Sequence, residues 1–267
     1  MLQRVLRKGA FVAGLLLSFV LPARAEEAQP CPAARLSAIS LPHLKRALTA
    51  NQDVTIVALG SSSTAGSHAS DVAHTYPAIL QRELERALPT SHIAVLNRGV
   101  GGQDATEMLA RLEKDTLALS PTVVIWQVGA NGAMRGMDPE LFKRLVGSGV
   151  KRLEAAGVDV ILMDNQRAPV ILASAQHARI DQALADVAAH QGAGLFARGQ
   201  LMDLWQQEGS PYSEFISDDG VHHNDHGYAC VAKALAATIL DGLRPQPAVR
   251  TAQSVRATRA ESGSISP

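Results

Sequence analysis

Four short stretches of this chain contain the residue types that acyl transfer from an ester requires. They are residues 60–64, 97–102, 129–131 and 219–222. In turn they offer serine hydroxyls, backbone N–H groups between glycines, a side-chain amide, and an imidazole close to a carboxylate. Each stretch follows a predicted strand or precedes a predicted helix, so the carboxyl edge of a parallel sheet would bring them together. The sequence therefore predicts one site built from all four.

The hydroxyl cluster follows the apolar run 54–59, which is typical of a buried strand. Gly60 and Gly66 permit a tight turn there, and a serine in that turn stands where a nucleophile is useful. A serine-rich capping turn and a phosphate-binding loop are the alternatives, although no GxxxxGK[ST] lysine follows. Taken alone, this stretch leaves the nucleophile open.

The candidate base is His222, three residues after Asp219. Imidazole removes a serine proton near neutral pH when a carboxylate orients its other nitrogen, and these two residues are close enough to do so directly. A metal site of His222, His223, Asp225 and His226 is the alternative, because histidines four apart on a helix share a face. That site lacks a clear ligand elsewhere, and we expect His223 and His226 at the surface.

Two further stretches supply candidate donors for a developing oxyanion. Gly102 ends a glycine-rich turn after the second strand, and the backbone of such a turn approaches a ligand closely. Asn131 follows the third strand and offers its amide at the same edge. Either feature alone is common in turns. Their order relative to the serine and histidine stretches favours one site.

The elements that must position these residues alternate along the chain. Buried-strand patterns rich in Val and Ile occupy residues 54–59, 93–96, 123–128, 158–163 and 194–196. Amphipathic helical patterns occupy residues 41–50, 76–88, 105–117, 139–156, 175–190 and 225–240. Asp138 before Pro139 predicts the start of the helix over 139–156, and Gly157 predicts its end. The alternation predicts an α/β fold with a parallel sheet covered on both faces.

Residues 1–25 are typical of a secretory signal, with three basic residues, an apolar run and Ala23-Arg24-Ala25 as a cleavage site. The run is shorter than the ~20 residues of a membrane-spanning helix. Without it, 21 basic and 25 acidic residues leave a net charge of −4, which does not favour nucleic-acid binding. We therefore expect a domain over 26–243, a disordered tail over 244–267, and a periplasmic or secreted protein without a stable membrane anchor.

Cys31 and Cys230 are the two cysteines of the chain. An oxidising compartment would favour a disulfide between them, which would attach the N-terminal segment to the last helix. The alternative is two separate thiols, and the sequence leaves the choice open.

The four stretches together resemble the SGNH, or GDSL-like, hydrolase family over residues 54–240. The resemblance implies a three-layer α/β/α flavodoxin-like fold with a central parallel sheet of about five strands. It also implies Ser62 as nucleophile, His222 as base and Asp219 as its partner. The oxyanion hole would comprise the Ser62 and Gly102 N–H groups and the Asn131 amide.

Two positions depart from the family pattern, because Ser61 and Gly132 stand where the family often has Asp. Neither belongs to the expected catalytic set, so the departures bear on loop bracing and substrate. The resemblance implies a carboxylic-ester hydrolase that needs no cofactor or metal, with a small-molecule or glycan O-acetyl ester as substrate. A lysophospholipase or thioesterase, a catalytically silent binding domain and a metal-dependent hydrolase are the alternatives.

Overall fold

The structure, a computed structural model, describes residues 29–244. The predicted signal segment 1–25 and nearly all of the predicted tail lie outside these residues. By its internal contacts the chain forms two units, one that ends at Pro30 and one that begins at Cys31. Every element described below lies in the second unit. No helix among the described residues has both the length and the apolar character needed to cross a membrane.

Five parallel strands form the central sheet in the order β2-β1-β3-β4-β5. They are β1 Val54–Gly60, β2 Ile93–Gly99, β3 Val123–Gln127, β4 Asp159–Met163 and β5 Gly194–Phe196. The predicted strands lie at the same places, with ends shifted by up to three residues. The parallel sheet and its strand number are therefore confirmed.

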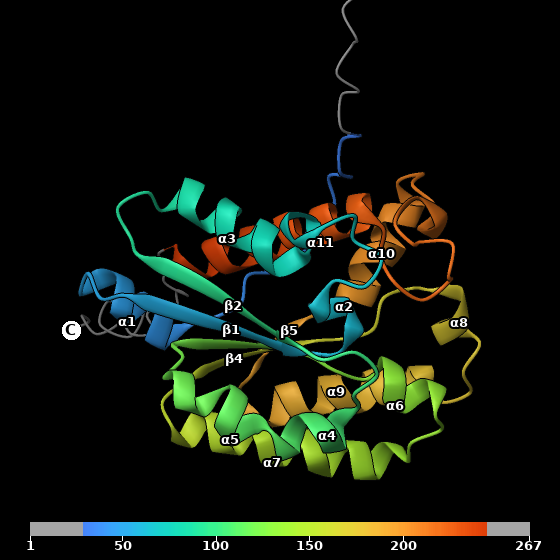
Figure 1. Cartoon of the computed structure of the whole chain (residues 1–267), viewed down its shortest axis with the longest axis horizontal. Helices are drawn as coiled ribbons and strands as arrows, with labels where there is room; N and C mark the ends of the chain where they lie inside the picture. The colour runs from blue at the N-terminus through green and yellow to red at the C-terminus, as the bar shows by residue number, and fades with distance from the viewer. Residues whose placement is uncertain (1–28, 245–267) are drawn as a thin grey trace, which may run out of the picture. The chain divides into compact units, whose positions relative to one another are not determined.

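Helices cover both faces of the sheet (Figure 1). One core cluster joins the sheet to α1 Pro42–Thr49, α3 Tyr76–Ala87, α10 Arg198–Gln207 and α11 Asp225–Leu243. The other joins it to α4 Ala105–Ala110, α5 Leu112–Asp115, α7 Pro139–Ala155 and α9 His177–Gln191. Successive side chains of a strand point to opposite faces of the sheet. In β1, Ile56 and Ala58 therefore belong to the first cluster, whereas Val57 and Leu59 belong to the second. The three-layer α/β/α architecture is confirmed.

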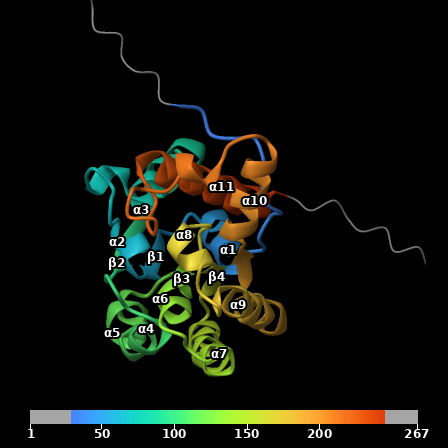
Figure 2. The same ribbon diagram turned by 90° about the vertical axis from the view of Figure 1, so that its right-hand side faces the viewer.

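Short helices occupy several of the connections between the longer elements. They are α2 Ser62–Ala65, α6 Ala130–Met134, α8 Pro169–Leu172, η1 Val72–His74, η2 Leu117–Leu119 and η3 Tyr212–Glu214. Helices α2, α6 and α8 follow β1, β3 and β4, and they lie toward the viewer in Figure 2. Helices α2 and α6 belong to two of the predicted site stretches, and residues 97–102 form the end of β2 and the turn after it, so the carboxyl edge of the sheet carries three of the four stretches.

Two helix predictions need correction. The single helix expected over 105–117 is divided at Arg111 into α4 and α5. The Arg111 guanidinium donates to the carbonyl oxygen of Gly60 at 3.0 Å and to Gln103, so this residue is directed toward the end of β1. Helix α10 was missed, although Leu201, Met202 and Trp205 have helical spacing and are buried. The predicted Asp138 cap is confirmed, because its carboxylate accepts from the N–H of Leu141.

A disulfide joins Cys31 to Cys230, whose Cα atoms lie 5.3 Å apart. It attaches the segment before α1 to α11, which begins three residues after His222. The pairing that the sequence left open is therefore present.

Candidate active site

The nucleophile stretch forms the turn between β1 and α2. A Cβ at Gly60 would lie 2.1 Å from the Thr64 hydroxyl, so a larger residue at this point would displace the Thr64 side chain. Ser61 is buried, and both its N–H and its hydroxyl donate to Gln127 Oε1 at 3.0 Å. The serine that replaces the usual family Asp is thus tied to the end of β3, and Ser62 begins α2 beside it.

Ser62, His222 and Asp219 form one chain of hydrogen bonds. Ser62 Oγ lies 2.7 Å from His222 Nε2, although the two residues are 160 positions apart. His222 Nδ1 lies 2.5 Å from Asp219 Oδ2. The structure therefore brings these three predicted residues together in the order that base-assisted attack requires.

The Asp219 carboxylate is oriented by its own loop. Its Oδ1 accepts from Ser217 Oγ at 2.6 Å and from the N–H groups of Val221 and His222, both at 2.9 Å. Burial would raise the pKa of Asp219, but these hydrogen bonds outweigh it and hold the pKa well below its usual range. The carboxylate is therefore charged at neutral pH, with Oδ2 directed to His222.

The predicted oxyanion donors lie on neighbouring loops. Gly102 has a left-handed backbone, with φ of +78°. Asn131 is the second residue of α6, and its Nδ2 donates to the carbonyl oxygen of Gln103 at 2.8 Å. Since an amide nitrogen carries two hydrogens, one remains for another acceptor. The structure thus links Asn131 to the loop that contains Gly102, and the oxyanion role of both stays a prediction.

Sequence reasoning missed two residues that contact this set or its immediate chain neighbours. His68 Nε2 lies 3.1 Å from Asp219 Oδ2, and the His68 ring stacks on that of His222. Gln166, fully buried after β4, donates from Nε2 to Ser63 Oγ at 3.2 Å and to the Val221 carbonyl oxygen at 2.7 Å. Gln166 therefore bridges the nucleophile turn and the histidine loop.

The expectation that His223 and His226 lie at the surface was wrong for His223, whereas His226 is partly exposed. His223 is 0% exposed, and its Nδ1 lies 2.9 Å from the Phe215 carbonyl oxygen. Burial, reinforced by the charge of Arg198, lowers the pKa of His223 to about 3, so this ring is neutral. His226 is half-buried and stacks on Phe215. Within residues 29–244, the alternative four-residue metal cluster does not form, because His223 faces the interior.

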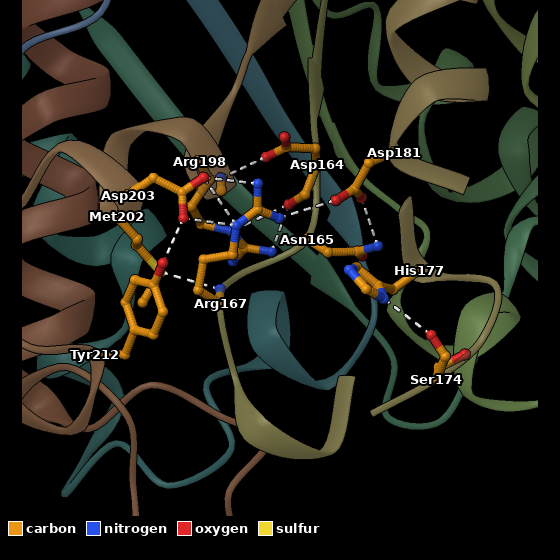
Figure 3. A network of polar contacts seen from close by, with 11 residues as sticks. Asp164, Asn165, Arg167, Ser174, His177, Asp181, Arg198, Met202, Asp203 and Tyr212 are labelled. Atoms are coloured by element: carbon orange, nitrogen blue, oxygen red, sulfur yellow. Dashed lines mark hydrogen bonds and ion pairs between the residues drawn. The ribbon is translucent and has the colours of Figure 1, made fainter. Parts of the chain in front are cut away.

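A second polar network lies just beyond the end of β4 (Figure 3). Arg167 donates to both carboxylate oxygens of Asp203 and, at 3.1 Å, to Asp181 Oδ2. Tyr212 donates its hydroxyl to Asp203 Oδ1. The network joins the loop that begins with Asp164 to α9, α10 and η3, so it braces the segment that carries Gln166.

Asp164, at the start of this loop, makes the stability depend on pH. Burial, followed by the charge of Asp181, raises the pKa of Asp164 from 3.8 to about 7. Between pH 4 and pH 7, Asp164 is ionised in the unfolded chain and protonated in the folded chain. The free energy of unfolding therefore decreases as the pH rises from 4 to 7, because ionisation stabilises the unfolded chain.

We expect the Asp164→Asn variant to keep its unfolding free energy as the pH rises, because Asn does not ionise. Its side-chain oxygen can still accept the hydrogen bond from the Gly199 N–H. The variant should exceed the wild type in unfolding free energy by roughly 3–4 kcal/mol at pH 7.5 and by little at pH 4. Urea unfolding at both pH values measures this, with the exposed Asp53→Asn as control. An equal difference at the two pH values would contradict the assignment.

Known proteins resemble this chain in sequence. The profile of the non-GDSL lipase-like family matches residues 29–245. An arylesterase of Vibrio mimicus is 22% identical over 188 residues, which cover 70% of this chain and 89% of that relative.

Two solved structures share the fold. A two-domain esterase active on acetylated mannans has a TM-score of 0.67 and 23% identity over 80% of this chain, and the match spans only 58% of that esterase. An acetylxylan esterase from Geobacillus stearothermophilus, solved as a catalytic mutant, has a TM-score of 0.60 and 17% identity over 72% of this chain and 97% of that one.

Proposed function

The chain belongs to the non-GDSL lipase-like family and is an ester hydrolase, and from this premise we propose that it works through an acyl-enzyme formed on Ser62. The contact that carries the proposal is the 2.7 Å approach of Ser62 Oγ to His222 Nε2, with Asp219 on the other ring nitrogen. A hydroxyl so placed can lose its proton as it attacks a carbonyl carbon.

In the proposed reaction, His222 Nε2 takes the Ser62 proton while Oγ bonds to the ester carbonyl carbon. The N–H groups of Ser62 and Gly102 and the Asn131 amide stabilise the oxyanion. His222 then protonates the leaving alcohol as the ester bond breaks. Water, deprotonated by His222, attacks the acyl-enzyme and releases the acid, and the proton returns to Ser62. Asp219 holds the imidazolium throughout.

For the substrate, we propose a short-acyl or O-acetyl ester on a carbohydrate or cell-envelope polymer. The support is the acetylated-glycan activity named for two structural relatives. We also propose that the protein is exported, because residues 1–25 are typical of a secretory signal and the Cys31–Cys230 disulfide suits an oxidising compartment.

Labelling with a fluorophosphonate, with the adduct located by mass spectrometry, tests the nucleophile. We expect one adduct, on Ser62, and none on its neighbours Ser61 and Ser63, which are buried. An adduct at another residue, or none on protein that cleaves esters, would refute the proposal.

A panel of aryl esters from acetyl to decanoyl, run beside acetylated glycans, tests the substrate class. We expect kcat/KM to fall by at least about tenfold from acetyl to decanoyl, since a site shaped for a short acyl group does not fit the additional methylenes, and one methylene is worth ~1 kcal/mol or more. A preference for decanoyl would instead favour the lysophospholipase or thioesterase alternative.

A further inference from the structure

Three potential metal ligands meet on the side of His222 that faces away from Ser62. They belong to His68, Asp219 and His222, each of which offers one ligand atom within 4.8 Å of the other two. His68 Nε2 and Asp219 Oδ2 are 3.1 Å apart. Two ligands of one tetrahedral Zn²⁺, each bonded at about 2.0–2.1 Å, have nearly this separation.

The loop that carries His68 is fixed in place. The Tyr228 hydroxyl donates to the Ser67 carbonyl oxygen at 2.7 Å, and the Ser70 N–H donates to Asp225 Oδ1 at 2.8 Å. His68 itself has a left-handed backbone, with φ of 66°. Its ring lies 5.3 Å from the His222 ring at an angle of 12°. Both imidazoles are therefore held beside the same carboxylate oxygen before any ligand arrives.

The charges at this point favour a cation. Oδ1 of Asp219 is already used by three donors, which leaves Oδ2 for the two imidazoles. On the other side of His68, the 98%-exposed Asp218 carboxylate lies 3.9 Å from Nδ1. At this distance Asp218 forms no direct hydrogen bond, but its negative charge adds to that of Asp219 near the two imidazoles.

We propose that His68, Asp219 and His222 bind Zn²⁺ and that this ion inhibits the enzyme. Two imidazole nitrogens and one carboxylate suit zinc, whereas Mg²⁺ and Ca²⁺ prefer oxygen ligands. For Nδ1 to bind Zn²⁺, the neutral ring must change tautomer: the hydrogen on Nδ1 is lost, Nε2 gains one, and the hydrogen bond from Nδ1 to Asp219 is broken. Nε2 then already carries a hydrogen and cannot take the Ser62 proton. The inhibitory part rests on the proposed function, whereas the binding part does not.

Competition with a fluorescent zinc chelator, on the full chain, measures the binding. We expect one tight zinc per chain and at least a tenfold weaker affinity in His68→Asn, since Asn tolerates the left-handed backbone. The matched control is His74→Asn, because His74 lies on the same loop and its Nδ1 contacts Asp71 at 2.9 Å. The control should bind zinc like the wild type. Thermal unfolding without zinc checks that both variants are folded.

Esterase assays with zinc, followed by a chelator, test the inhibition. We expect wild-type and His74→Asn activity to fall reversibly at the zinc concentrations that saturate binding, and the His68→Asn inhibition constant to rise at least tenfold. Unchanged affinity in His68→Asn, or no binding by the wild type, would overturn the zinc site and leave Ser62 labelling unaffected. Binding without inhibition would overturn the inhibitory role, and a missing Ser62 adduct would refute the proposed function alone.

Discussion

Replacement of Ser62 by Ala is expected to lower kcat for aryl acetate hydrolysis by about 10⁴-fold or more, with a much smaller change in KM. The methyl group cannot form the acyl-enzyme, whereas the oxyanion donors and the binding surface remain. The hydroxyl that is lost is the one 2.7 Å from His222 Nε2. Steady-state kinetics on purified wild-type and variant protein measure the effect.

The matched control is Ser63→Ala, which removes the neighbouring hydroxyl. Ser63 is buried, and its Oγ accepts a 3.2 Å hydrogen bond from Gln166, which keeps its second bond to Val221. We expect a loss of less than about tenfold. If both variants lost activity equally, the turn as a whole would matter more than the Ser62 hydroxyl, and Ser62 would not be the nucleophile.

The fold was predictable because local pattern and tertiary structure agree. Strands such as β1 are apolar on both faces, as a strand covered by helices on each side must be. Three of the predicted site stretches lie at the ends of such strands, and parallel strands place their carboxyl ends at one edge. The stretch that carries His222 precedes α11 instead, so its approach to Ser62 across 160 positions does not follow from the strand rule alone.

The contacts that were missed depend on the paths of loops. His68 reaches Asp219 only because its backbone is left-handed at a residue other than glycine, which the sequence does not signal. Gln166 reaches Val221 because the loop after β4 folds under the histidine loop. His223 is buried, with its Nδ1 against the Phe215 carbonyl oxygen, although its neighbours in the sequence are polar. Hydrophobic periodicity contains none of this information.

The second large effect is expected from Gly99→Ala at the end of β2. A Cβ there would lie 2.1 Å from the backbone nitrogen of Ala65 and 2.6 Å from its Cα, so it would collide with the main chain of α2. A main chain cannot move aside as a flexible side chain can, and Asn97 holds α2 close by donating to the Thr64 carbonyl oxygen at 2.8 Å. We expect a loss of about 3 kcal/mol in unfolding free energy, measured by urea unfolding.

The same collision should displace Ser62, the first residue of α2, so esterase activity should fall at least tenfold even where the protein is folded. Gly101→Ala separates this steric effect from the general cost of replacing glycine in the loop. A Cβ at Gly101 would meet Ser62 Cβ at 3.9 Å, an ordinary contact, and Gly101 does not have a positive φ. We expect that variant to lose less than about 1 kcal/mol. Equal stability losses in the two variants would mean that β2 and α2 are not packed as closely as the structure places them.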